Sequence, residues 1–147
     1  LLDQDGEYFA RAVLASKGLI FTEGFNYYRK YIYGKNVAGQ SHKRKNLESA
    51  LYSLEKKTGY LLERKDDERV RKAIATQLLD LAINTYPQFP DLTRKIQKLI
   101  KMQGQAPRIP VLGGKEIEFI KKTLGWKAAK FVSYHYHKKL IHRKNQS

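Results

Sequence analysis

Apolar side chains recur about every 3.6 residues through the middle of the chain, which is the spacing of one face of a helix. Three such stripes predict three consecutive helices: one over about 44–64, one from Asp66 or Asp67 to Pro87, and one from Pro90 to Gly104. Aspartate caps helices, proline is tolerated in a first turn, and glycine ends them. The stripes are Leu47, Leu51, Leu54, Leu61 and Leu62; then Val70, Ile74, Leu78 and Leu81; then Leu92, Ile96, Leu99 and Ile100.

Weaker patterns flank these helices. Before them, we expect a helix from about Glu7 to Lys17 and a helical piece from about Gly24 to Tyr33. After them, residues 105–114 contain two prolines and a glycine pair and predict a loop. Helices from Lys115 to Leu124 and from Trp126 to Leu140 follow, separated by Gly125. The predicted fold is all-α: a basic N-terminal helical arm (1–46) followed by a helical bundle (47–147).

Composition narrows the possible functions. With 147 residues and 41% hydrophobic side chains, the chain is long and apolar enough for one folded domain. The absence of cysteine excludes disulfides, thiolate nucleophiles and thiolate metal sites. No apolar run is long enough to span a membrane, and the first residues lack a signal-peptide pattern, so we expect a soluble chain.

Basic side chains far outnumber acidic ones. The chain has 29 Lys and Arg against 14 Asp and Glu, a net charge of +15, which a polyanion such as nucleic acid would neutralise. Residues 1–46 carry a net charge of +4 and residues 104–147 carry +8, whereas the middle 57 residues carry +3. No acid occurs from Phe25 to Asn46 or after Glu118. The excess of positive charge therefore predicts two binding surfaces, which flank a helical core of nearly balanced charge.

Aromatic residues alternate with the cations in both acid-free stretches. Lysine and arginine can contact phosphates, and tyrosine can donate to phosphate or stack on bases. Phe25, Trp126 and Phe131 are instead expected in the core. The predicted nucleic-acid contacts are Tyr27, Tyr28, Arg29, Lys30, Tyr31, Lys35, Lys43, Arg44, Lys45, Lys121, Lys122, Lys127, Lys130, Lys138, Lys139, Arg143 and Lys144.

Histidines near the C-terminus raise a metal hypothesis that their spacing disfavours. His135 and His137 diverge on a helix, and although His142 shares a face with His135, no acid lies nearby to complete a metal site. No metal site is therefore expected.

Catalytic groups are also not expected. The acids cluster only around Asp66 and Asp67, among basic neighbours, which is typical of capping and ion pairs rather than of a nuclease site for Mg²⁺. Gly113-Gly114-Lys115 could hold one phosphate, but a plain helix entry explains it as well. We expect no catalytic residue and no cofactor.

The sequence fits membrane binding and sequence-specific DNA reading less well than non-specific binding of nucleic acid. An interfacial membrane helix would separate bulky apolar residues from lysines, and residues 115–140 mix them, so no membrane partner is expected. Leu124-Gly125-Trp126 resembles the turn of a helix-turn-helix reader, but Lys127 and Lys130 behind it suit phosphate contact more than base reading. Non-specific binding is the better interpretation.

In overall form, this small, cysteine-free chain with a basic helical arm and a helical bundle resembles the major coat proteins of rod-shaped and filamentous viruses of hyperthermophilic archaea. The resemblance implies subunits that pair and wrap double-stranded DNA, with residues 25–45 as the wrapping arm and 47–140 as the outer bundle. It implies a homo- or hetero-oligomer with related subunits, located in the virion.

The rival resemblance is to the small helical subunit of multi-subunit RNA-guided (CRISPR) effector complexes. That resemblance implies a cytoplasmic protein that lines a nucleic-acid channel within a large ribonucleoprotein, instead of many copies along a duplex. A third class, a small nuclease, has the least support from the residues.

Overall fold

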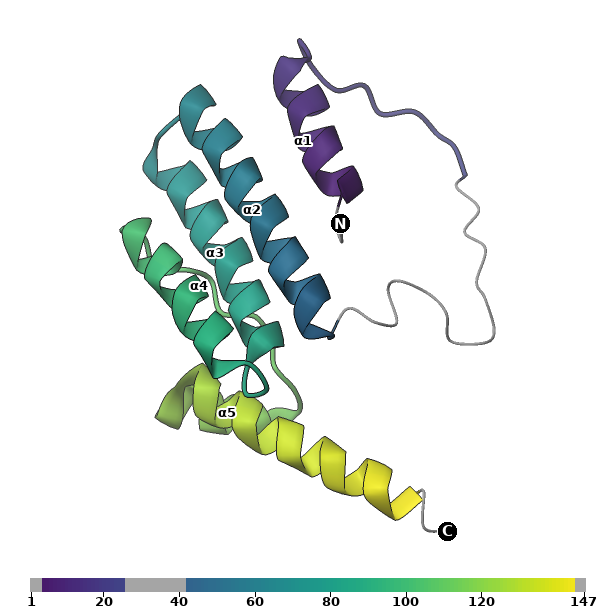
Figure 1. Cartoon of the computed structure of the whole chain (residues 1–147), viewed down its shortest axis with the longest axis vertical. Helices are drawn as coiled ribbons and strands as arrows, with labels where there is room; N and C mark the ends of the chain where they lie inside the picture. The colour runs from purple at the N-terminus through teal and green to yellow at the C-terminus, as the bar shows by residue number, and fades with distance from the viewer. Residues whose placement is uncertain (1–3, 26–41, 145–147) are drawn as a thin grey trace.

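The structure, a computed structural model, describes residues 4–25 and 42–144, with side chains for residues 5–25 and 42–137. The described residues form helices and connecting loops with no strand, so the predicted all-α bundle is confirmed. Helices α2, α3 and α4 pack side by side and alternate in direction, while α1 packs against α2 and runs in the same direction (Figure 1). The helices are α1 (Gln4–Ala15), α2 (Arg44–Arg64), α3 (Glu68–Thr85), α4 (Pro90–Met102) and α5 (Lys115–Lys144).

Helix boundaries in the bundle follow the capping residues. The Asp67 carboxylate accepts a hydrogen bond of 2.8 Å from the backbone N–H of Val70, which caps α3 as predicted. Pro90 occupies the first turn of α4, and Gly104, with φ of +67°, follows its end. Helix α2 has no side-chain cap at its start, but it matches its predicted bounds, and α4 begins at Pro90 as predicted and ends two residues before Gly104.

The predicted stripes form the core of the bundle. Leu51, Ile74, Leu78 and Ile96 are at most 2% exposed, whereas Leu61 and Leu62 near the end of α2 are only partly buried. A hydroxyl pair, Thr85 with Thr93 at 2.8 Å, joins α3 to α4 inside this core. The core cluster contains Leu47, Leu51, Leu54, Ile74, Leu78, Leu81, Ala82, Leu92 and Ile96.

Helix α1 is held to α2 by a polar contact. The Tyr60 hydroxyl donates a hydrogen bond of 2.8 Å to a Glu7 carboxylate oxygen, and this bond lowers the pKa of Glu7 and raises that of Tyr60. The helix begins three residues before and ends two residues before its predicted bounds. The opposite face of α1 leaves Tyr8 and Phe9 exposed, at 60% and 62%.

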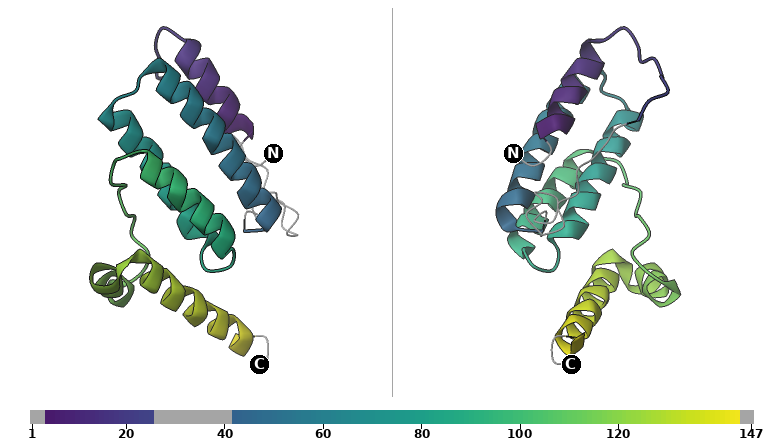
Figure 2. Two further views of the ribbon diagram at one scale, coloured as in Figure 1. Left: turned by 60° about the vertical axis from the view of Figure 1, so that its left-hand side comes forward. Right: turned by 90° about the vertical axis from the view of Figure 1, so that its right-hand side faces the viewer.

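The two predicted C-terminal helices form one helical element with a break. Gly125 has φ of +84°, a backbone conformation that favours glycine, and it separates the two halves of α5. The second half continues to Lys144, beyond the predicted end at Leu140. Figure 2 shows that α5 crosses the end of the bundle at which α4 begins and then extends away from it.

Trp126 and Ala129 pack α5 against the bundle. Trp126 is partly buried against the core, and its ring meets Tyr86 edge to face with 5.8 Å between centroids. Ala129, one turn later, has no exposed surface. The prediction that Trp126 packs against the core is thus confirmed.

The same prediction is wrong for two other aromatic residues. Phe25 is 91% exposed, and Phe131 is 48% exposed. Phe25 lies in the segment after α1, and Phe131 lies on α5 between Lys130 and Tyr134, which line a cleft, but it does not line that cleft itself. An aromatic residue is buried only where another helix covers it, and the residue type does not reveal whether one does.

Candidate nucleic-acid interface

Part of the predicted contact set cannot be placed. The arm residues Tyr27, Tyr28, Arg29, Lys30, Tyr31 and Lys35 lie outside the described residues, as does most of the helical piece predicted at 24–33. Lys138, Lys139, Arg143 and Lys144 belong to α5, but the structure describes only their backbone. The remaining seven predicted residues lie at the start of α2 and along α5.

Arg44, a predicted phosphate contact at the start of α2, is bound to two carboxylates within the chain. Its guanidinium donates two hydrogen bonds to the Asp91 carboxylate, of 3.2 and 2.5 Å, and one of 2.8 Å to Glu48. Bonds to these carboxylates raise the pKa of Arg44 and lower that of Asp91. The residue therefore joins the start of α2 to the start of α4. Its neighbours Lys43 and Lys45 are exposed, and no described carboxylate pairs with them.

Lys121, a predicted phosphate contact on α5, also has partners within the chain. Its ammonium donates a hydrogen bond of 2.8 Å to the Pro110 carbonyl and forms an ion pair of 2.5 Å with Glu118, and its side chain is only 13% exposed. Glu118 also accepts a hydrogen bond of 2.7 Å from the backbone N–H of Leu112, and these donors lower its pKa. Glu118 thus accepts from a backbone N–H just before the helix begins at Lys115, as in a plain helix entry.

Three predicted lysines of α5 remain available to a ligand. Lys122 and Lys127 are exposed and Lys130 is half-buried, and none of them pairs with a carboxylate among the described residues. Lys127 donates a hydrogen bond of 3.1 Å to the side-chain oxygen of Gln97 on α4. This contact brings α5 against a surface that the sequence analysis did not select.

That surface is the outer side of α4. Arg94, Lys98 and Lys101 are all exposed and follow one another at helical spacing. The only acid of α4, Asp91, is bound by Arg44, while Lys95 on another side of the helix pairs with Glu55 at 3.5 Å. Averaging charge over residues 47–103 concealed this row, although its spacing along a helix without an adjacent acid is visible in the sequence.

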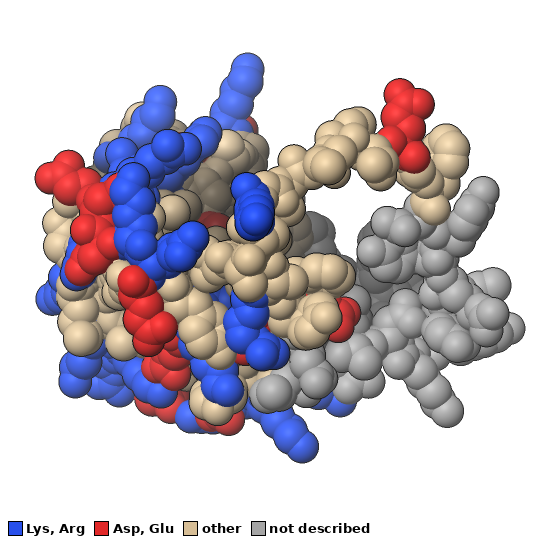
Figure 3. Space-filling view, turned by 90° about the horizontal axis from the view of Figure 1, so that it is seen from above, with Lys and Arg blue, Asp and Glu red and all other residues tan. Residues whose placement is uncertain are grey.

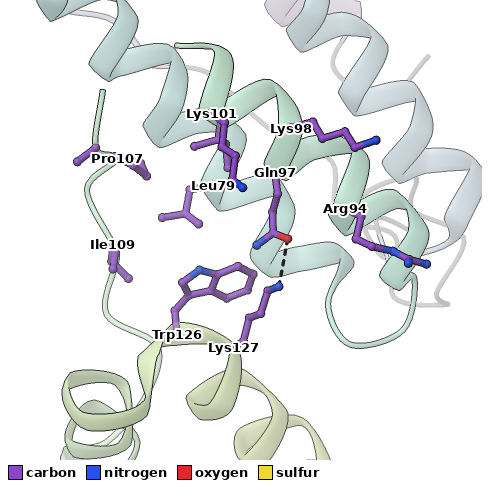
Figure 4. Close-up of a pocket in the computed structure, with 11 residues that line it drawn as sticks. Leu79, Arg94, Gln97, Lys98, Lys101, Pro107, Ile109, Trp126 and Lys127 are labelled. Atoms are coloured by element: carbon purple, nitrogen blue, oxygen red, sulfur yellow. Dashed lines mark hydrogen bonds between the residues drawn. The ribbon is translucent and has the colours of Figure 1, made fainter. Parts of the chain in front are cut away.

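The row borders a cleft of about 660 Å³ between α4, α5 and the loop that joins them, here called the Trp126 cleft. In Figure 4 the Trp126 indole lies within the cleft below Lys101, with Pro107 and Ile109 on one side and the bond between Gln97 and Lys127 on the other. No acid lies among the described residues that line this cleft. These residues are Leu79, Arg94, Gln97, Lys98, Ile100, Lys101, Ala106, Pro107, Ile109, Trp126 and Lys127.

A second cleft, of about 410 Å³, lies on another side of α5, against the ends of α2 and α3. Its lining includes His42, Gln88, Lys130 and Tyr134, and the Gln88 amide donates a hydrogen bond of 2.9 Å to the Tyr134 hydroxyl. None of the described residues that line this cleft is acidic either. The part of α5 that meets the bundle therefore carries an acid-free, cationic lining on both sides.

The acid cluster between α2 and α3 has a structural role. Arg71 bonds both oxygens of Asp66, at 2.5 and 2.6 Å, and Lys65 pairs with the capping Asp67 at 2.9 Å. Figure 3, which looks onto this end of the bundle, shows acidic and basic side chains intermingled. The interpretation as capping and ion pairs is confirmed.

Metal ligands do not gather among the residues that the structure describes: no group of three His, Asp or Glu side chains is close enough to hold an ion. His135 instead meets the ring of Tyr134 edge to face, with 5.4 Å between centroids, and His137 meets Tyr136 at 6.0 Å.

Within the described ranges, no helix has both the length and the apolar character needed to cross a membrane.

No protein-family model, curated protein or solved structure matches the chain. We therefore infer function from the chemistry of the described surfaces.

The clamp between Arg44 and Asp91 predicts a specific dependence on pH. Because Arg44 holds the pKa of Asp91 below its ordinary value of 3.8, the pair stabilises the fold above that pH, and its contribution is lost as the pH falls through the lowered pKa. Asp91→Asn should lower the Tm at neutral pH, and the two proteins should converge near about pH 2. Circular dichroism melts at both pH values measure this.

Asp80→Asn is the matched control. Partial burial raises the pKa of Asp80 without a cationic partner, so removing its charge should not lower the Tm at neutral pH. An Asp91→Asn variant that melts with the wild type at neutral pH would contradict the clamp.

Proposed function

We propose that the chain is a non-enzymatic structural protein that binds nucleic acid without sequence specificity and coats double-stranded DNA. The observation that carries this proposal is the acid-free surface formed by the outer row of α4 and by α5. A lysine or arginine attracts phosphate most strongly when no Asp or Glu of the chain already pairs with it. Arg94, Lys98, Lys101 and Lys127 meet this condition, whereas Arg44 and Lys121 do not.

The geometry of the row suits a phosphate backbone. Arg94 and Lys101 are seven positions apart on the helix, a rise of about 10 Å at 1.5 Å per residue. Lys127 reaches α4 from α5 and bonds Gln97, which lies between Arg94 and Lys98 in the sequence. Cations on two elements can therefore contact several successive phosphates, which gives affinity and orientation without reading bases. This arrangement supports the non-specific mode.

Exposed apolar side chains support the part of the proposal that concerns assembly. Leu19, Ile20 and Phe21 are 77%, 92% and 92% exposed, and the outer face of α1 adds Tyr8 and Phe9. Contiguous exposed apolar surface commonly marks contact with another protein. A coat needs such contacts between copies along the duplex, and the virion is the location that goes with this function. The arm residues from Tyr27 to Lys35 stay part of the proposed DNA contact.

Replacing three cations of the surface should weaken binding through charge alone. For Lys98→Ala, Lys101→Ala and Lys127→Ala combined, we expect the slope of log affinity against log salt concentration to flatten by about 0.9 for each phosphate that the variant no longer neutralises. Fluorescence anisotropy of a labelled duplex at several KCl concentrations measures the slope.

A triple variant with the same change in net charge serves as the control. Lys17→Ala, Arg69→Ala and Lys72→Ala remove three exposed cations at the end of the bundle away from α5. This control should keep nearly the wild-type slope. Equal slopes for the two triple variants would show that only net charge matters and would remove the α4 and α5 surface from the mechanism.

The assembled state separates the coat from the alternative, a subunit of an RNA-guided effector complex. Electron microscopy of the purified chain with linear duplex DNA should show regular filaments, because a coat protein repeats along its duplex. Absence of ordered filaments under conditions where anisotropy shows saturated binding would favour the effector subunit.

A further inference from the structure

The Trp126 cleft combines features that a surface made only for phosphate contact does not need. Its floor is apolar, with Leu79, Ile100 and Ile109, and the Trp126 indole lies within it. The cations stand at its rim. A volume of about 660 Å³ falls in the range of roughly 300–1,000 Å³ that small-molecule sites occupy. The cleft therefore has room for a flat apolar ring in addition to the phosphates outside it.

The backbone break at Gly125 sets the position of the indole. Because the two halves of α5 separate there, Trp126 is the first residue of the second half and turns toward α4. One part of its surface packs against the core beside Tyr86, and another part lines the cleft. A half-buried indole held in this way is a rigid platform on which a base can stack.

Polar groups beside the indole match the edge and the phosphate of a nucleotide. The Gln97 side-chain oxygen accepts the bond from Lys127, which leaves its amide N–H groups to donate to a base. Lys101 points toward the indole, while Lys98 and Arg94 extend away from it along α4 in Figure 4. Such a row of cations leading out of the cleft suits phosphates that continue along a strand rather than a free nucleotide.

We propose that the Trp126 cleft receives one unpaired nucleobase of a single strand, stacked on Trp126, with its phosphate between Lys101 and Lys127 and the neighbouring phosphates along Lys98 and Arg94. This inference rests on the proposed nucleic-acid binding and adds a preference to it. Bases inside a duplex stay stacked on one another and cannot enter the cleft. The strands that enter are therefore single-stranded segments or frayed ends.

Trp126 is the one tryptophan of the chain, so its fluorescence reports on this cleft alone. We expect a twelve-residue thymidine oligonucleotide to quench the emission and to bind roughly tenfold more tightly than an abasic strand of equal length, which has the phosphates but no bases. Equal affinity for the two strands without quenching would overturn the proposal. Thymidine monophosphate that binds as tightly as the strand would overturn the assignment to a strand.

A blunt duplex separates failure of this inference from failure of the proposed function. Duplex binding by anisotropy with unchanged Trp126 emission, alongside quenching by the single strand, is the expected result. If the duplex binds and the single strand leaves the emission unchanged, the cleft proposal fails and the nucleic-acid function stands. If neither ligand binds at low salt, both proposals fail.

Filling the cleft gives a variant test that keeps the probe. Ala106 is exposed and lines the cleft, so Ala106→Phe should occupy the base position and weaken single-strand binding about tenfold, to the level of the abasic strand. Duplex affinity should not change. Val111→Phe is the matched control, because Val111 lies on the same loop, is 78% exposed and does not line the cleft. Equal single-strand affinities for the two variants would contradict the proposal.

Discussion

The placement of the few carboxylates decides which cations of this chain can act on a partner. Asp91 holds Arg44, Asp66 holds Arg71, and Glu118 holds Lys121, so these acids are bound into contacts that join helices or close loops. Only 14 acids face 29 lysines and arginines. The cations without such partners include the outer row of α4 and the exposed lysines of α5. One set of ion pairs thus organises the fold and leaves a defined surface unneutralised.

The attachment of α5 links this surface to the core. Trp126 packs beside Tyr86, Ala129 is fully buried, and Lys127 bonds Gln97, so a short part of α5 meets the bundle and the rest extends from it. The same contacts form the wall of the Trp126 cleft. The stability of this attachment and the shape of the proposed binding surface therefore depend on the same residues, and changes at Trp126 would affect both.

Local pattern was enough to predict the bundle, whereas the site depended on contacts that a sequence pattern does not show. Helix bounds followed from capping residues and from stripes such as Leu47 to Leu54, because both signals act over one or two turns. The pairing of Arg44 could not be predicted, because its partner Asp91 is 47 residues away. The row on α4 lies in a segment of low net charge, and its cations stand out only when they are placed on a helix face.

The proposed function depends most on where nucleic acid lies on the molecule. Protection of lysines from an amine-reactive reagent measures this position directly. Mass spectrometry of the chain labelled with and without saturating duplex DNA reports each lysine separately. The account predicts protection of Lys98, Lys101 and Lys127, with Lys17 and Lys72 remaining as reactive as in the free protein. Protection of Lys17 and Lys72 while the lysines of α4 and α5 stay reactive would contradict it.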